Sequence, residues 1–242
     1  MLAGFYFRMF YNKIYLIMTY QEIIKILKSQ ANPKNVAGMA RFGISAKNTL
    51  GISMPYLRNF AKKIGKDHKL ALQLWKSGIH EARILAALID EPDKVTPAQM
   101  DNWIKGFDSW DVCDQVCMNL FDKAPFAYKK VVEYAKRQRE FEKRTAFALM
   151  ASLAWHDKKS SDSRFKMFFP IIKKASGDER NFVKKAVNWA LRQTGKRNKN
   201  LNKLAIKTAK DILKIKSKSA QWIAKDALRE LEGEAVQRRL TS

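Results

Sequence analysis

The chain is dominated by a pattern in which apolar residues recur every three or four positions, the spacing that places them along one face of a helix. No segment shows the strict apolar-polar alternation that indicates a half-buried strand. Proline and glycine fall between the periodic segments and mark their breaks. The predicted helices cover residues 20–29, 36–42, 55–64, 69–77, 80–88, 97–104, 110–121, 125–136, 140–155, 164–175, 180–193, 200–213 and 220–231. The predicted fold class is all-α.

A weak internal repeat relates the second helices of successive helix pairs. Segments that begin at residues 80, 140, 180 and 220 align, with the helix at 110–121 midway between the first two. Helix pairs at intervals of about 40 residues are typical of HEAT-like repeats, which stack into a curved surface. We therefore expect residues 18–242 to form a single domain, a curved α-solenoid of HEAT-like helical repeats.

Equivalent positions on the inner helices of such a solenoid line its concave side, which would place Arg83, Asp114, Arg144 and Lys184 in one row. Charges in a row can form a ladder that links neighbouring repeats, and we favour this interpretation for Arg83 and Glu81. They can also form a functional site. For Asp114 and Arg144 the pattern does not choose between ladder and site.

Residues 1–17 differ from the rest of the chain. They are apolar and aromatic, but Arg8 and Lys13 interrupt them and they are short for a membrane span. They also lack the apolar core and the cleavage site of a signal peptide. The capping box from Thr19 to Glu22 predicts that the fold begins there. We expect residues 1–17 to be an N-terminal extension outside the fold, and an amphipathic membrane-surface anchor is the less favoured alternative.

The balance of charge indicates what kind of partner the protein binds. The 47 Lys and Arg residues exceed the 23 Asp and Glu residues, which gives a formal net charge of +24. Such an excess points to a polyanion, either nucleic acid or an anionic membrane surface. The 46% hydrophobic content excludes a disordered basic tail. The chain is therefore expected to be a folded, basic protein.

The positive charge is concentrated in residues 180–218, which contain thirteen basic residues and a single acid, Asp211. A loop at 196–200 carries three of them and can meet phosphates, whereas the spaced lysines beyond it suit a helix that follows a nucleic-acid backbone. Trp189 and Arg192 lie three residues apart on the helix predicted for 180–193. They can offer an aromatic face beside a phosphate-binding group, or Trp189 can be a core residue beside an exposed Arg192.

The stretch at 107–120 places Trp110 and Asp114 one helical turn apart in an otherwise apolar segment. Ser109 or Asp108 can cap the start of this helix. A carboxylate beside an indole is unusual in a core. Either Asp114 is a buried acid that pairs with an arginine while Trp110 fills space, or the two residues form part of a functional site.

The cysteines and histidines do not indicate a metal or disulfide framework. Cys113 and Cys117 share the same helix, where we expect them to be small buried hydrophobes in a reducing, cytoplasmic compartment. The three histidines, His68, His80 and His156, are scattered, with no ligand set at the spacing of a zinc site. We expect no metal and no cofactor.

Over about residues 19–232 the chain resembles the AlkD-type HEAT-repeat DNA glycosylases of the DNA alkylation repair family. The motifs that carry the resemblance are SWDVCD at 109–114, KRTA at 143–146 and KAVNWALR at 185–192, with weaker support from GISMPYLR at 51–58 and HEAR at 80–83. The resemblance implies excision of cationic N3- or N7-alkylated purines from double-stranded DNA. It also implies that the protein grips the DNA backbone at the lesion and leaves the damaged base outside a pocket.

The resemblance assigns roles to individual residues. Asp114 takes the place of the catalytic carboxylate, Trp110 and Trp189 of two cleft tryptophans, and Arg144 of a cleft arginine. Ser152 stands where the family can carry a phosphate-binding lysine, so that contact is in doubt here. The expected DNA-binding residues are Arg41, Lys184, Lys185, Arg192, Lys196, Arg197 and Lys199.

The implied chemistry suits a single carboxylate. A cationic purine is already a good leaving group, and the transition state resembles an oxocarbenium ion on the deoxyribose. One acid can stabilise that charge and orient water, while indole faces attract it. Two other classes of function stay open: a non-catalytic basic solenoid that binds nucleic acid by shape, and a scaffold that binds peptides. In each case we expect a monomer that is not bound to a membrane.

Overall fold

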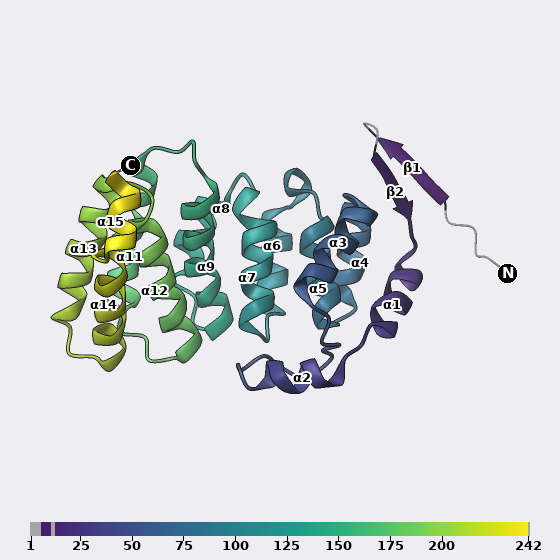
Figure 1. Cartoon of the computed structure of the whole chain (residues 1–242), viewed down its shortest axis with the longest axis horizontal. Coiled ribbons are helices and arrows are strands. Elements are labelled where there is room, and N and C mark those ends of the chain that lie inside the picture. The colour runs from purple at the N-terminus through teal and green to yellow at the C-terminus, as the bar shows by residue number, and fades with distance from the viewer. Residues whose placement is uncertain (1–5, 11–12, 242) are drawn as a thin grey trace. The chain divides into compact units, whose positions relative to one another are not determined.

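The computed structural model of the protein describes residues 6–10 and 13–241. Its contacts divide the chain into two compact units, Met1–Pro125 and Phe126–Ser242. Within each unit, helices pack side by side (Figure 1).

The first unit contains every helix predicted for that part of the chain, with ends that agree to within three residues. Its α1 helix begins at Tyr20 as expected, because the Thr19 hydroxyl accepts the Glu22 backbone N–H and the Glu22 carboxylate accepts the Thr19 N–H at 2.7 Å. The elements are β1 (Tyr6–Phe10), β2 (Lys13–Ile17), α1 (Tyr20–Ser29), α2 (Pro33–Ala40), α3 (Met54–Ile64), α4 (His68–Lys76), α5 (His80–Ile89), the 3-10 helix η1 (Pro92–Lys94), α6 (Pro97–Lys105), α7 (Trp110–Asn119) and the 3-10 helix η2 (Phe121–Lys123).

The two strands lie in a segment for which the sequence predicts no element, and the rest of the described chain is helical, as the predicted all-α class expects. They form an antiparallel pair in which Tyr6 faces Ile17 and Phe10 faces Lys13. The segment is rich in aromatic and β-branched residues, which favour strands, but its apolar residues run together and give no alternating signal. Strand β2 also lies against α3, so residues 13–17 contact the helical part of the unit.

The second unit departs from the predicted helices at two places. The single helix expected at 164–175 is two helices, because Pro170 has no N–H to donate to the carbonyl of Lys166. The final helix was not predicted, since it is polar and Val236 is its one buried residue. The elements are α8 (Ala127–Tyr134), α9 (Glu140–His156), α10 (Asp162–Lys166), α11 (Phe168–Ala175), α12 (Asn181–Gly195), α13 (Lys199–Leu213), α14 (Lys218–Leu231) and α15 (Glu234–Thr241).

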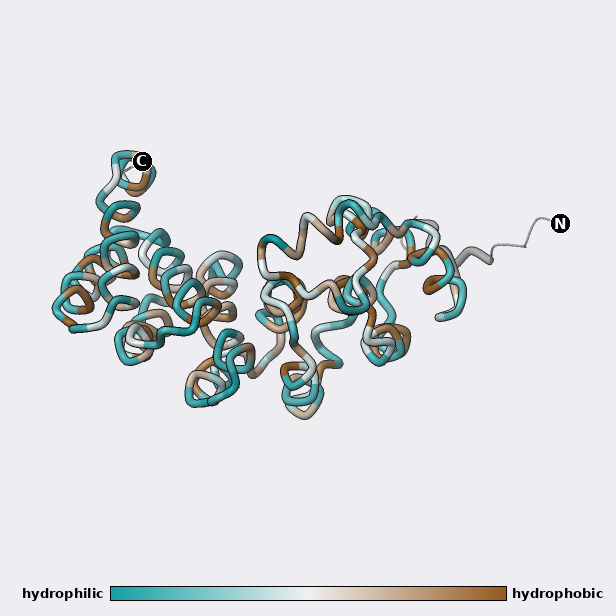
Figure 2. The backbone as a smooth tube through the Cα atoms, turned by 90° about the horizontal axis from the view of Figure 1, so that it is seen from below, coloured by the Kyte–Doolittle hydropathy of each residue, from teal (hydrophilic) through white to brown (hydrophobic). Residues whose placement is uncertain are grey.

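Both units have apolar cores between their helices, and Figure 2 shows brown, hydrophobic stretches alternating with teal, hydrophilic ones along the helical turns. In the first unit α5 packs on α4, α3 and α7, and the rings of Trp75 and Trp103 stack at 4.1 Å. In the second unit α12 packs between α9 and α14. A Cβ at Gly195 would meet Ala205 at 2.6 Å, so only glycine permits α12 and α13 to approach this closely.

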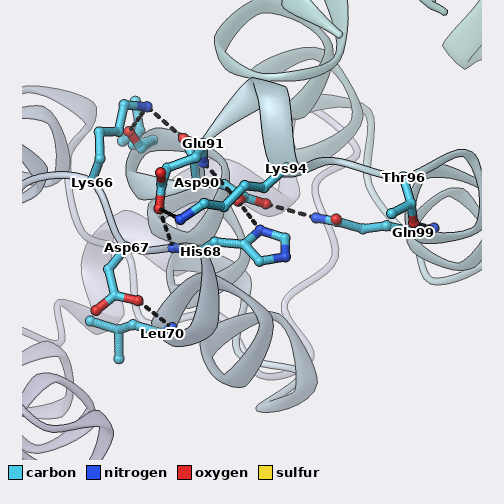
Figure 3. Close-up of polar contacts among 10 residues, drawn as sticks. Lys66, Asp67, His68, Leu70, Asp90, Glu91, Lys94, Thr96 and Gln99 are labelled. Carbon is cyan, nitrogen blue, oxygen red and sulfur yellow. Dashed lines mark hydrogen bonds and ion pairs between the residues drawn. The ribbon is translucent and has the colours of Figure 1, made fainter. Parts of the chain in front are cut away.

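A buried carboxylate, Asp90, joins three segments of the first unit (Figure 3). It follows α5, and its side chain contacts His68 Nδ1 of α4 at 2.6 Å and accepts the Gln99 amide of α6 at 2.7 Å. The backbone N–H of Glu91 donates to the same carboxylate at 2.7 Å. Three polar partners therefore depend on one acid that is closed to solvent.

We expect Asp90→Ala to lower the free energy of unfolding by about 2–4 kcal/mol, because it leaves buried polar groups without their acceptor. Urea unfolding followed by circular dichroism measures the change. Asp93→Ala removes an exposed acid of the neighbouring η1 and should change the stability by no more than about 0.5 kcal/mol. Equal unfolding midpoints for the two variants would contradict the importance of this cluster.

Candidate functional site

The start of α7 carries the two residues that the sequence singled out. Trp110 is the first residue of the helix and is half-buried, and its indole Nε1 donates to the Phe42 carbonyl at 3.0 Å. Asp114 lies one turn later, between the buried Cys113 and Val116 on either side. The Asp114 residue has an exposed fraction of 9%, so it is mostly buried but keeps some access to solvent.

The start of α7 is anchored to α5 by a histidine-aspartate pair that the sequence analysis did not find. His80 Nε2 contacts Asp111 Oδ2 at 2.8 Å, and the Ser109 hydroxyl donates to the other Asp111 oxygen at 2.6 Å. Ser109 is the N-cap residue, as expected, but its side chain binds Asp111 instead of a backbone N–H. Trp110 and Asp114 are thus placed by contacts on both sides of the helix start.

The environment of this pair favours its charged form. Burial lowers the pKa of His80, but the hydrogen bond and charge of Asp111, aided by Glu81 and Asp108, outweigh burial and raise the pKa above 6.5. Burial raises the pKa of Asp111, but the His80 and Ser109 contacts outweigh it and hold the pKa below 3.8. The pair is therefore an ion pair in the range between the two pKa values.

Arg83 also links α5 to the loop before α7. Its Nη1 donates to the Gly106 carbonyl at 3.0 Å and lies 3.6 Å from an Asp108 oxygen, while its guanidinium lies over the Trp75 ring. Arg83 therefore joins neighbouring helices, as the ladder interpretation expected. Glu81, which was expected to belong to the same ladder, binds elsewhere.

Glu81 holds the loop that leads from α2 to α3. Its buried carboxylate accepts the backbone N–H groups of Leu50, Gly51 and Ile52 at 2.8, 2.6 and 3.2 Å. Gly51 has a φ of 77°, and a Cβ there would meet the Asn32 carbonyl oxygen at 2.4 Å. The same loop carries Phe42 and the exposed Arg41, so Glu81 and the Trp110 indole fix it at two points.

Both cysteines of α7 are buried, as expected, and both are free thiols. Burial raises the pKa of the Cys117 thiol well above its usual value, and the neighbouring Cys113, Asp114 and Asp122 raise it further. Cys117 therefore stays protonated near neutral pH. It contributes packing behind Asp114.

In the second unit, Arg144 lies in the first turns of α9 and is buried. Its Nη1 donates to the backbone carbonyl of Phe182 on α12, and the rings of Phe141 and Phe182 stack beside this contact at 5.5 Å. Trp189 is half-buried, two turns further along α12. Arg144 thus connects the two helices, which leaves the ladder interpretation open for this residue.

Two of the predicted phosphate-binding residues contact acids of α14. Arg192 Nη1 donates to Glu230 and lies 3.6 Å from Asp226, and Lys196 Nζ donates to Glu230 at 2.5 Å. Burial raises the pKa of Glu230, but the two cations outweigh it and lower that pKa. The Asn188 amide adds a 2.6 Å bond to Asp226. These contacts form a ladder between α12 and α14.

The remaining basic candidates differ in how strongly the protein engages them. The Arg197 guanidinium lies 3.7 Å from the Phe165 ring centroid and donates to the Ala154 carbonyl at 2.7 Å, and burial lowers its pKa. Lys184 Nζ lies 5.5 Å from the Trp222 ring centroid. Lys185 and Lys199 are exposed.

Trp110, Asp114 and Arg41 belong to the first unit, and the other candidates belong to the second. Their meeting in one groove stays a prediction. In residues 6–10 and 13–241 no group of three or more His, Cys, Asp or Glu side chains is arranged to hold a metal ion. None of the described helices combines the length and apolarity needed to cross a bilayer.

The sequence model of the family described as DNA alkylation repair enzyme matches residues 23–231. The chain belongs to this DNA alkylation repair family. Both stretches with the strongest candidate residues, 110–114 and 144–192, lie within the matched region. Among curated proteins, none matches the sequence.

A solved structure supports the fold of this family member. It is a protein from a family related to the HEAT-like repeat DNA glycosylases, with affinity for branched DNA structures. The two chains align with a TM-score of 0.75 and 19% sequence identity, and the alignment covers 92% of this chain and 96% of the other. The chain therefore has the fold of HEAT-like helical repeats. A designed armadillo repeat protein in complex with a (KR)4 peptide has a TM-score of 0.40 and 12% identity over 77% of this chain and 78% of its own, too low to inform the fold.

We expect proton NMR of the three histidines of this family member to give a pKa for His80 above 6.5, which Asp111→Asn lowers below 6.5 because burial then dominates. The stabilisation from the raised pKa is complete below the unfolded value of His80 and is lost as the pH rises through the folded value. The stabilisation from the lowered Asp111 pKa is lost as the pH falls through its folded value. An unchanged His80 titration in Asp111→Asn would contradict the pairing.

Proposed function

We propose that the protein is a DNA glycosylase that hydrolyses the N-glycosidic bond of cationic N3- or N7-alkylated purines in double-stranded DNA. The observation that carries the proposal is Asp114, a mostly buried carboxylate one turn after the fixed indole of Trp110, in a member of the DNA alkylation repair family. The formal net charge of +24 supports a DNA substrate.

Asp114 is suited to stabilise positive charge that develops during the reaction. When the bond to a cationic purine breaks, the base leaves as a neutral molecule and the deoxyribose becomes oxocarbenium-like. A carboxylate with little solvent around it interacts strongly with such a charge, because water screens it less. The same oxygen atoms can orient the water that attacks the sugar. No general acid is needed for a leaving group that is already cationic.

Trp110 complements the carboxylate through the face of its ring. Because its N–H donates to the Phe42 carbonyl, the indole acts through its π-surface, which attracts a cationic sugar. The second unit supplies Trp189 and Arg144 in this proposal, with Trp189 as a second aromatic surface and Arg144 as a cation for the adjacent phosphate.

The basic residues divide into two groups in the proposed DNA contact. Lys185, Lys199 and Arg41 are exposed and can meet phosphates directly. Arg192 and Lys196 share Glu230, so each would bind a phosphate by exchanging a carboxylate partner. We expect these two to contribute less to affinity, although both raise the local positive potential.

A second candidate function is binding of branched DNA without excision. The solved relative described above has affinity for branched DNA structures, and the fold is shared. In this alternative Asp114 is a structural acid. The two functions differ in one measurable respect, the release of an alkylated base.

We expect Asp114→Asn to reduce the release of 7-methylguanine and 3-methyladenine from methylated duplex DNA by roughly 100-fold or more, because the transition-state charge loses its partner. The released bases are measured by chromatography. The affinity for unmodified duplex should stay within about twofold, since the substitution removes no phosphate contact.

Asp122→Asn is a matched control, because Asp122 is in the same unit and has the same exposed fraction of 9%. This control should excise like the parent protein. If the parent releases no base, or if Asp114→Asn and the parent release it equally, the glycosylase proposal fails and branched-DNA binding is favoured.

The exposed lysines give a separate prediction about phosphate contacts. We expect Lys185→Ala and Lys199→Ala each to reduce the slope of log affinity against log salt for duplex DNA by about 0.9, the value for one lost phosphate contact. Titrations between low and moderate salt measure the slope. Lys94→Ala, which removes a lysine paired with Glu91 at 3.0 Å, is the control and should leave the slope unchanged. Equal slopes for all four proteins would rule out these contacts.

A further inference from the structure

A second basic site lies in the second unit, at the carboxyl ends of α9 and α12 beside α15. It is a cavity of about 320 Å³. The polar and aromatic residues that line it are Trp155, Lys158, Gln193, Lys196, Arg197 and Arg239. All belong to one unit, and Trp155, Lys158, Gln193 and Arg239 have no role in the proposed excision.

The lining of this cavity carries four cations, of which Lys196 is paired with Glu230 outside the lining, and its described lining residues include no acid. The framework around it is fixed, because Arg239 donates to the Lys196 carbonyl at 3.0 Å and Arg197 donates to the Ala154 carbonyl at 2.7 Å. The buried Arg197 Nε has no hydrogen-bond partner in the protein. Such a lining is suited to bind an anion.

Trp155 gives the site a second chemical character. Its exposed fraction is 52%, which is high for a tryptophan, and Lys158 Nζ lies 5.6 Å from its ring centroid. An exposed indole next to cations is the arrangement with which proteins bind single-stranded nucleic acid, because the ring stacks on a base while the cations hold the phosphate. Paired bases in a duplex present no free face for such stacking.

The volume of the cavity limits how many nucleotides it can hold. Its volume is at the lower end of small-ligand pockets, which suits one base and its phosphate but not a double helix. We propose that this cavity binds one unpaired nucleotide of a DNA strand, with the base stacked on Trp155 and the phosphate held by Lys158 and Arg239. The inference rests on the proposed function only in that the ligand is DNA, and it adds a preference for DNA with a single-stranded arm.

The test compares affinities for a blunt duplex and for the same duplex with a single-stranded tail, by fluorescence anisotropy. The parent should bind the tailed DNA more tightly. Trp155→Ala should weaken tailed binding by about tenfold, the effect of one lost base stack, and leave blunt binding within about twofold. Trp155→Phe should retain most of the preference for tailed over blunt DNA. Lys158→Ala should lower the affinity for tailed DNA by about threefold, because it removes the phosphate contact.

Trp222→Ala is the matched control, since Trp222 is 41% exposed and lies near Lys184 but does not line the cavity. Its ratio of tailed to blunt affinity should equal that of the parent. An equal affinity of the parent for the two DNAs, or an equal loss on both in Trp155→Ala, overturns the inference. Competition by a free deoxynucleoside monophosphate as effective as that by a single-stranded oligonucleotide also overturns it, in favour of a mononucleotide site.

The excision assay separates this inference from the proposed function. Trp155→Ala should release alkylated bases from blunt duplex at the parent rate, because Trp155 has no part in that chemistry. Excision without a preference for tailed DNA refutes only the nucleotide site. A parent protein that binds no DNA refutes both proposals.

Discussion

The ion pair between His80 and Asp111 is the constraint on which the geometry of the first unit depends. It joins the first residue of α5 to the first turn of α7 and so determines where Trp110 and Asp114 lie relative to the rest of the unit. Removing either member of a mostly buried pair leaves the other charge without compensation, so such a link tolerates little change in the positions of its two residues. Arg83 adds a second bridge between the same elements, and the stacked Trp75 and Trp103 fill the space beneath it.

Much of the helical fold could be predicted from the sequence, because each helix buries one face and its apolar period is therefore visible. The start of α1 agrees to the residue, since the Thr19 capping box is a local interaction. The apolar pattern did not predict the observed helices at two places. The apolar pattern is continuous over 164–175, but the missing N–H of Pro170 divides this segment into two helices. Helix α15 buries only Val236, so its sequence shows no apolar face. The strands at residues 6–10 and 13–17 show no alternation in the sequence because their apolar residues are consecutive.

The candidate site could be predicted only as far as it is local. The four-residue spacing of Trp110 and Asp114 follows from helix geometry, but the partners of Glu81 are about 30 residues away in the sequence and have no signature there. The basic stretch at 180–218 contains Asp211 as its one acid, and Asp226 and Glu230 lie just beyond it, one repeat further on. The stacking of α12 on α14 brings these acids back to Arg192 and Lys196. A count of charges along the sequence cannot show which acids the fold brings next to these basic residues.

The capture of three successive backbone N–H groups by Glu81 has a consequence for the loop between α2 and α3. A surface loop of this kind usually loses conformational freedom when it meets its ligand, and that loss weakens binding. Here the loop is held at two points when the chain folds, because the Glu81 carboxylate binds residues 50–52 and the Trp110 indole binds the Phe42 carbonyl. The Phe42 side chain, with an exposed fraction of 74%, therefore projects from a backbone position that is already fixed by the Trp110 indole before any ligand binds.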